Sequence, residues 1–441
     1  MRKVSSMGKR IIILCDGEVK HPFDKTSNTS NIAKLFLSIP LVSHRHGKEI
    51  VQLTYYNRGH GVCSPAPELM NEESPARELE RDIFQAYKFI SKNYRDGDEI
   101  MLFGFSGGAL TVRSVCSFLT DFGLIRFNKV PEFMRLFRKY KHREFTAQLH
   151  DSAKRRKFCR ANLCYAQHAL GDDLVPPQNL RVRVIGCFEA VGRSSLPRHE
   201  RSYDFPNLSL SPRVENAFHA LALDEERATH VPEIWVVDPR NRTTNLKQVW
   251  FPGTHANLGG GTGKYLAPAG KTLPRFKKPY PNLLANGAFV WMVSQCSDMI
   301  DFKYDVLRDL TYDRYVQSMK YLSRDCEGRP YWCDGPVFDN SRWYQSVFAS
   351  TGVRRLGHSH RMPWNRTSHK EKIYEYNDVD TCESVHKSAV DRYSRSYEWS
   401  APLQSYLYEE KHFWKMDEDG NETFVGVEQP NEVERSLWLP A

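Results

Sequence analysis

The sequence predicts an α/β fold in which a mostly parallel sheet is flanked by helices. Short apolar runs rich in β-branched residues alternate with longer amphipathic stretches, as in βαβ units built around a buried sheet. The 441 residues include 24 Phe, 21 Tyr and 9 Trp, which is enough apolar material for a large packed core. Functional groups are expected at the carboxyl ends of the strands, where parallel sheets place their sites.

Five apolar runs are expected to form strands, and three amphipathic stretches are expected to form helices between them. The expected strands are residues 11–15, 49–56, 98–105, 181–188 and 247–252, and the expected helices are residues 31–39, 75–94 and 107–121. Pro40 lies just beyond the first helix and is a natural stop for it. This alternating order brings the carboxyl ends of the first three strands to one edge of the sheet.

The charge balance is mildly basic, with a formal net charge of +9. This excess favours anionic surfaces such as phospholipid headgroups, whereas nucleic acid is not expected as a partner, because no nucleic-acid-binding motif is present. The ten cysteines include no C-x-x-C pair, which removes support for zinc-ribbon and thioredoxin-like proteins. The apolar run after the basic start, residues 11–14, is too short for a signal peptide, so a cytoplasmic location is expected.

The segment Gly104-Phe105-Ser106-Gly107-Gly108 follows the third expected strand and opens the third helix. In a nucleophile elbow, a serine occupies a strained strand-to-helix turn, and small neighbours prevent backbone collisions. The Gly107 N–H and the amino end of the helix would favour an oxyanion developing beside Ser106. The alternative is the glycine-rich turn of a nucleotide-binding fold, but its G-x-G-x-x-G pattern is absent. Ser106 is therefore the candidate nucleophile.

A serine nucleophile requires a base, and His255 is the best candidate. It follows the expected strand 247–252 directly and is predicted to lie on a glycine-rich loop, where a mobile imidazole could meet Ser106. His60, between two glycines, is a weaker rival. His219 is predicted to lie in an amphipathic helix and to be structural.

The base must be oriented by a carboxylate, and Glu189 follows the expected strand 181–188 directly. The chain order Ser106, Glu189, His255 is then the nucleophile, acid, base order of α/β-hydrolases. Asp224 and Asp238 are alternative acids, although neither follows so clear a buried run.

The chain resembles a known family, the α/β-hydrolases related to the type VI secretion phospholipase effectors. This family is also found as fungal proteins. That family reads D-G-T, T-N-[VI]-x-x-L, Y-Y-D-x-G-V-G, G-F-S-R-G-A, W-D-T-V-G, H-A-L-A-L-D-E and F-P-G-x-H-x-D-V-G-G-G in order. The matching segments are residues 16–18, 30–35, 55–61, 104–109, 188–192, 219–225 and 251–261. The resemblance implies an α/β-hydrolase-like sheet over roughly residues 10–295.

The resemblance also implies a triad of Ser106, Glu189 and His255 that cleaves ester bonds, usually of phospholipids, through an acyl-enzyme. An oxyanion hole is expected from backbone N–H groups at Gly107 and at Gly17 or Glu18. Residues expected to line the site are Asp16, Asn57, Phe105 and Asn257. The expected partner is a lipid or small ester substrate, and this chemistry requires no cofactor.

Several residues near the candidate nucleophile depart from the family pattern. Glutamate replaces aspartate at Glu189, glycine replaces arginine at Gly107, and glutamate replaces threonine at Glu18, while both Asn57 and Asn257 replace aspartates. A glutamate can serve in such triads. Three hypotheses remain: an active serine hydrolase of lipids or other esters, a catalytically inactive hydrolase fold that acts as a binding or interaction module, and an intracellular thioesterase or peptidase that uses the same triad.

Three regions are expected along the chain. Residues 8–300 would form the α/β-hydrolase catalytic domain, interrupted at 125–178 by a basic helical insert or cap, and residues 301–441 would form a C-terminal region packed on the core. The insert's lysines and arginines are typical of a solvated helical face. Transient contact with an anionic membrane surface is the alternative role for them.

Overall fold

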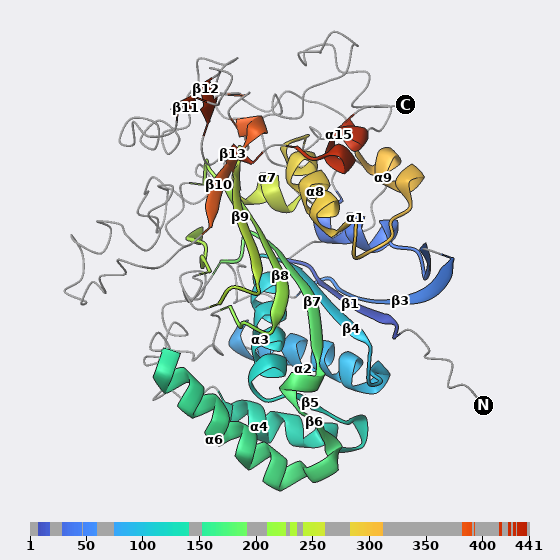
Figure 1. Cartoon of the computed structure of the whole chain (residues 1–441), viewed down its shortest axis with the longest axis vertical. Helices are drawn as coiled ribbons and strands as arrows, with labels where there is room; N and C mark the ends of the chain where they lie inside the picture. Colours follow the sequence, from blue (N-terminus) through green and yellow to red (C-terminus); the bar gives the residue numbers. More distant parts are fainter. Residues whose placement is uncertain are drawn as a thin grey trace, which may run out of the picture.

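A nine-stranded sheet runs through the middle of the molecule, with helices on both of its faces (Figure 1). In sheet order its strands are β13 (Val427–Glu428), β10 (Glu383–His386), β9 (Asn245–Phe251), β8 (Val214–Ala222), β7 (Arg181–Phe188), β4 (Glu99–Phe105), β1 (Arg10–Cys15), β3 (Lys48–Asn57) and β2 (Val42–Arg45). All neighbouring strands are parallel except β2 and β3. The prediction of a mostly parallel sheet flanked by helices is therefore confirmed.

The computed structural model describes residues 8–17, 29–45, 47–59, 75–140, 152–191, 210–225, 230–235, 241–260, 283–311, 382–389, 392, 414–416, 422–424, 427–428 and 430–438. In this part of the chain, no helix combines the length and the apolar character needed to cross a bilayer. A separate two-stranded sheet pairs β11 (Trp414–Met416) with β12 (Glu422–Phe424).

The two faces of the sheet carry separate hydrophobic cores, and β1 contributes to both. Ile11 and Ile13 pack with residues of α2 (Pro75–Asn93) and α3 (Gly107–Asp121), whereas Ile12 and Leu14 pack with residues of α1 (Asn31–Ser38) and α8 (Leu283–Cys296). Burial on both faces explains why β1 is an unbroken apolar run. Figure 1 shows α1 with α8 and α9 (Tyr304–Thr311) on one face and α2 with α3 on the other.

This arrangement creates a switch point in the strand order beside β1. The chain leaves β1 through α1 on one face to reach β2 and β3, and it leaves β4 through α3 on the other face toward β7, on the opposite side of β1. Because the two connections cover opposite faces, they diverge at the carboxyl ends of β1 and β4, where open α/β sheets bind their ligands. The fold therefore places residues 16–17 and Ser106 next to each other.

The prediction that His219 lies in an amphipathic helix is wrong, because residues 214–222 form the central strand β8. The segment has three alanines and a leucine, and its apolar residues fit a helical spacing. However, β8 pairs in parallel with β7 on one side and with β9 on the other, and residues 217–222 are all buried. The tertiary position has overridden a local helical preference.

The expected insert region contains helices, as the composition predicted, and its two ends are paired. Short strands β5 (Leu124–Ile125) and β6 (Leu174–Val175) form an antiparallel pair. Between them lie α4 (Phe133–Tyr140) and α6 (Ser152–Leu170), together with short 3₁₀ turns. Phe133 and Phe137 are buried, and both of their rings contact Phe118 of α3. The described part of this region is therefore attached to the outer side of α3.

The C-terminal third contributes to the central sheet, which the sequence did not indicate. Strand β10 pairs with β9, and the helix α15 (Glu432–Trp438) contacts α8. His386 of β10 lies 2.8 Å from the Glu434 carboxylate of α15, and both side chains are fully buried. The His386 ring also stacks on Phe251, the last residue of β9. These contacts connect α15 to the strand that leads into His255.

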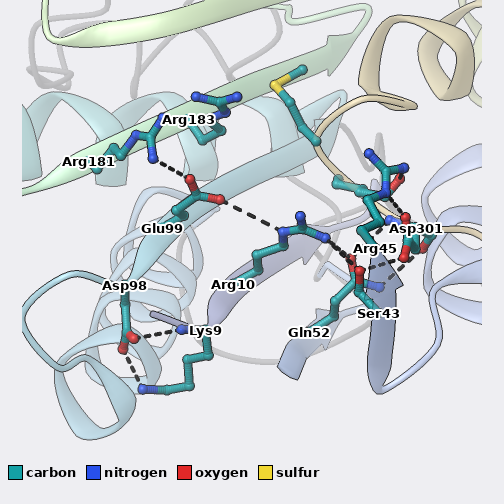
Figure 2. A network of polar contacts seen from close by, with 12 residues as sticks. Lys9, Arg10, Ser43, Arg45, Gln52, Asp98, Glu99, Arg181, Arg183 and Asp301 are labelled. Carbon is teal, nitrogen blue, oxygen red and sulfur yellow. Dashed lines mark hydrogen bonds and ion pairs between the residues drawn. The ribbon is translucent and has the colours of Figure 1, made fainter. Parts of the chain in front are cut away.

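A network of charged side chains crosses the amino ends of β1, β4 and β7 (Figure 2). Arg10, only 6% exposed, donates to Ser43 Oγ at 3.2 Å and to Gln52 Oε1 at 2.9 Å, and it lies 3.8 Å from Glu99. The more exposed Arg181 pairs with Glu99 at 2.5 Å. Arg10 therefore links β1 to β2, β3 and β4 at the end of the sheet opposite Ser106.

Replacing Arg10 should therefore destabilise the protein far more than replacing Arg181. Arg10→Ala removes a buried cation and leaves polar partners without it, so we expect a loss of about 3 kcal/mol in the free energy of unfolding. Arg181→Ala, the matched control at a half-exposed position, should cost about 1 kcal/mol or less. Urea unfolding followed by circular dichroism measures both. Equal losses would show that the buried network has no special role.

Candidate active site

The three candidate catalytic residues meet at the carboxyl edge of the sheet. Ser106 follows β4, Glu189 follows β7, and His255 begins α7 (His255–Gly259) shortly after β9. His255 Nε2 lies 3.0 Å from Ser106 Oγ, and His255 Nδ1 lies 3.0 Å from Glu189 Oε2. Ser106 is 5% exposed, His255 is 7% exposed and Glu189 is fully buried. Residues that are 149 and 66 positions apart in the sequence are thus joined through one imidazole.

Ser106 occupies a strained turn that depends on its small neighbours. Its backbone adopts φ 54° and ψ −120°, a conformation that non-glycine residues rarely adopt. A Cβ on Gly108 would lie 2.1 Å from the Cys15 carbonyl oxygen, and one on Gly104 would lie 2.5 Å from the Gly108 carbonyl oxygen. Only glycines allow α3 to start this close to β1 and β4. A strained serine on a tight strand-to-helix turn is the arrangement that a nucleophile elbow requires.

Glu189 is held rigidly by the neighbouring strand. Its backbone also has a positive φ, 47°, and its N–H donates to the Ala220 carbonyl oxygen at 2.9 Å. Its Oε1 accepts the Ala222 N–H at 2.6 Å, which leaves Oε2 for the His255 ring. Because a carboxylate can only accept, Nδ1 donates to Glu189 and Nε2 is left to accept from Ser106 Oγ.

His255 lies on the short helix α7, so the prediction that it sits on a glycine-rich loop is wrong. Thr254 and Asn257 form a capping box that begins α7, in which Asn257 Oδ1 accepts from the Thr254 N–H at 3.1 Å. The Phe105 ring packs against the imidazole with 4.9 Å between ring centroids. Asn257, expected to line the site, is fully buried and caps the helix on which His255 lies.

Two residues beside His255 were not identified from the sequence. Glu225 is 2% exposed, and its Oε2 accepts the His255 backbone N–H at 3.2 Å. The His230 ring lies perpendicular to the His255 ring, with 4.8 Å between centroids. Glu225 is the last residue of the 219–225 motif, which was a usable signal, whereas nothing in the sequence marks His230.

The rival acids and bases have other roles or lie outside the described residues. Asp224 Oδ2 accepts the Gly253 N–H at 2.6 Å, so this carboxylate holds the turn before His255. His219 Nε2 accepts the Ala190 N–H at 3.1 Å, and its Nδ1 faces Gln248 Oε1 at 3.3 Å. His219 thus fixes the residue after Glu189. His60, Asp238 and the expected oxyanion-hole residue Glu18 are outside the described part of the chain.

The backbone around Ser106 offers donors for an oxyanion on two sides. Gly107 is the first residue of α3, where N–H groups have no partner within the helix. Gly17 lies directly beside the serine, since a Cβ on it would be 3.2 Å from Ser106 Cβ. However, the Gly17 N–H already donates to Asp16 Oδ1 at 2.9 Å. Gly107 is therefore the better placed of these two donors.

Asp16 is a fully buried carboxyl group beside this turn. It accepts hydrogen bonds from the hydroxyls of Ser30 and Tyr56, the latter at 2.8 Å. Burial raises the pKa of Asp16 to about 7, and the hydrogen bonds from Ser30, Tyr56 and Gly17 only partly oppose that rise. Asn57 supports the same corner, because its carbonyl oxygen accepts the Asp16 N–H at 2.7 Å.

The assembled groups have the geometry required for nucleophilic catalysis: a hydroxyl, an imidazole that can take its proton, and a buried carboxylate that orients the imidazole. Within the described ranges, no group of three or more His, Cys, Asp or Glu side chains is arranged to hold a metal ion. The hydroxyl, the imidazole and the carboxylate together could transfer an acyl or similar group to Ser106.

The raised pKa of Asp16 predicts a pH-dependent stability. Unfolding returns the pKa of the Asp16 carboxyl to its ordinary value near 4. Between pH 5 and 8 this carboxyl is therefore ionised in the unfolded chain, whereas the folded protein gives up its proton only around pH 7. The folded state binds more protons in this range, and its stability falls as pH rises, by about 2 kcal/mol from this group. Urea unfolding at pH 5 and at pH 8 measures this loss of stability, and the Asp16→Asn variant should lack the part that Asp16 contributes. An identical pH dependence in the two proteins would contradict it.

Comparison with known proteins identifies the family to which this sequence belongs. Residues 9–295 match the family model described as "T6SS, Phospholipase effector Tle1-like, catalytic domain". The uncharacterised protein YEL023C of Saccharomyces cerevisiae is 25% identical over 240 residues, covering 51% of this chain and 32% of the yeast protein. The chain thus spans about a third of the length of this relative.

Two solved structures are similar to parts of this chain at low sequence identity. One is the Tle1 effector bound to the VgrG spike from the type 6 secretion system, with 16% identity and a TM-score of 0.31 over 60% of this chain and 52% of that one. The other is an uncharacterised protein from Pseudomonas aeruginosa, with 14% identity and a TM-score of 0.37 over 66% and 45%. The family model matches more than half of the length of this chain. The chain therefore belongs to the Tle1-like phospholipase effector family, whose catalytic domain it contains.

Proposed function

We propose that this protein is a serine hydrolase of carboxylic esters that works through an acyl-enzyme on Ser106. Membership of the phospholipase effector family supports a lipase- or esterase-type hydrolase in general terms. The observation that carries the finer proposal is the imidazole of His255, which lies 3.0 Å from both Ser106 Oγ and Glu189 Oε2. A structural histidine has no need of a strained serine on one side and a buried carboxylate on the other.

In the proposed reaction, Ser106 Oγ attacks the ester carbonyl carbon and its proton moves to His255 Nε2. The negative charge on the carbonyl oxygen is stabilised by the Gly107 N–H at the amino end of α3. Collapse of this intermediate breaks the bond to the alcohol, which leaves with the proton from Nε2. Water then attacks the acyl-enzyme and gives up a proton to His255. His255 returns this proton to Ser106 Oγ as the bond to the acyl carbon breaks, which releases the carboxylic acid.

Glu189 is proposed to orient the imidazole and to stabilise its positive charge during both steps. The extra methylene relative to aspartate fits here, because the carboxylate bridges two groups: it accepts the Ala222 N–H with one oxygen and reaches His255 with the other. The substitution of Glu for Asp is therefore compatible with a working triad.

The proposed substrate is a lipid or another small carboxylic ester, with phospholipid favoured by the family's description. The Phe105 ring beside His255 adds an apolar surface next to the reacting groups. The net charge of +9 would favour transient contact with an anionic membrane surface. No cofactor is needed for this chemistry.

The second candidate is a hydrolase fold that binds partners without catalysis. One observation favours it: the Gly17 N–H, an expected oxyanion donor, is already engaged by Asp16. Losing one such donor typically costs on the order of 10²–10³ in kcat. The two candidates therefore differ in turnover rather than in fold.

Hydrolysis assays on the purified protein separate the two candidates. We expect release of fatty acid from phosphatidylglycerol-containing vesicles or of p-nitrophenol from acyl esters, and its loss, by a factor of about 10⁴ or more, in Ser106→Ala. Fatty-acid titration and absorbance measure the two reactions. If wild type hydrolyses neither acyl esters of any chain length nor vesicle phospholipid faster than Ser106→Ala does, the binding-module hypothesis is favoured over the hydrolase.

Glu189 variants test the role of the acid. Glu189→Gln keeps the size of the side chain but offers an amide to Nδ1, which favours the wrong tautomer, so kcat should fall by roughly 10³–10⁴ with KM little changed. Glu189→Asp should retain much more activity than the glutamine variant. Equal activity in the glutamine variant and wild type would assign the acid to another residue.

A further inference from the structure

We propose that Glu225 is a positioning residue for the catalytic base, holding His255 through its backbone rather than its ring. The inference rests on the proposed function, since it assigns Glu225 a role in that reaction. Glu225 is 2% exposed and lies three residues beyond the end of β8. Its Oε2 accepts the His255 N–H at 3.2 Å. A buried carboxylate placed on a backbone N–H calls for an explanation, because burying such a charge is costly.

The amino end of α7 explains what Glu225 contributes. The first N–H groups of a helix have no partner within the helix and must be satisfied from outside. The capping box between Thr254 and Asn257 satisfies the Thr254 and Asn257 N–H groups. The N–H of His255, the first helical residue, goes to Glu225. A carboxylate at this point also interacts favourably with the positive end of the helix dipole.

The position of His255 makes this contact relevant to catalysis. The imidazole extends from the first residue of a helix only five residues long, and the ring must reach two partners at 3.0 Å simultaneously. So short a helix has little internal stability of its own. Loss of the hydrogen bond to Glu225 would let its first turn move, and displacement of a reacting group by about 1 Å can cost on the order of 10²-fold in rate.

The neighbouring Asp224 acts on the same turn and strengthens the argument. Its backbone N–H donates to the Gly253 carbonyl oxygen at 2.9 Å, while its Oδ2 accepts the Gly253 N–H at 2.6 Å. Two consecutive acidic residues after β8 therefore hold Gly253 and His255, on either side of the Thr254 cap. The same strand supplies the Ala222 N–H that fixes Glu189. Residues at and just after the end of β8 thus hold both Glu189 and the turn that carries His255.

Substitutions at Glu225 test this role against that of a buried structural acid. Glu225→Ala removes the acceptor, and kcat on a p-nitrophenyl ester should fall roughly 10–100-fold with KM unchanged. Glu225→Gln keeps an acceptor oxygen of the same reach and should recover kcat to within about 3-fold of wild type. Glu215→Ala is the matched control, because it removes a carboxylate from the other end of β8, where Glu215 pairs with Arg181 and Arg183. It should leave kcat unchanged.

A second measurement does not depend on turnover. The Nδ1–H proton that His255 shares with Glu189 should give a far-downfield proton NMR signal, assigned by its loss in His255→Gln. We expect it in wild type, Glu225→Gln and Glu215→Ala, and its loss or upfield movement in Glu225→Ala. If wild type hydrolyses nothing, the proposed function fails while this signal still tests the placement of His255. A Glu225→Ala protein with an unchanged signal, or with wild-type kcat, would overturn the proposal, as would a glutamine variant as impaired as the alanine variant.

Discussion

The site depends on one constraint: the imidazole of His255 must hydrogen-bond to Ser106 and Glu189 at the same time, in a largely buried position. The two distances are both 3.0 Å, and the residues follow three different strands. Small errors in strand register would break one bond or the other. The parallel pairing of β4, β7, β8 and β9 is therefore the framework on which the chemistry rests.

The carboxyl end of the sheet carries strained turns, and its amino end carries a network of charged side chains that holds the strands together. At the carboxyl end, Ser106 and Glu189 both have positive φ angles, a conformation costing on the order of 1–3 kcal/mol for each such residue. At the amino end, the network around Arg10 ties four strands together (Figure 2). A well-packed sheet can keep such strained turns in place, because its strands leave them little room to relax.

Much of the fold was predictable because its signals are local, whereas the details of the site depend on distant contacts. The β-branched run at β1 indicates a strand, and the small residues around Ser106 indicate a tight strand-to-helix turn, without reference to the rest of the chain. Strand β8 was not predictable, since its three alanines and one leucine favour a helix, whereas pairing with β7 and β9 on its two edges makes it a strand. The contact of Glu225 with His255 joins residues 30 positions apart and depends on how α7 is capped. No periodic pattern records such a contact.

The central claim is that Ser106 is a nucleophile activated by His255 and Glu189, and covalent labelling tests it most directly. A fluorophosphonate reacts with an activated serine, so intact-mass spectrometry should show one adduct per chain, and peptide mapping should place it on Ser106. The adduct should be absent from Ser106→Ala and form far more slowly in Glu189→Gln. A wild-type protein that labels no faster than Ser106→Ala, or that carries the adduct on another residue, would contradict the account.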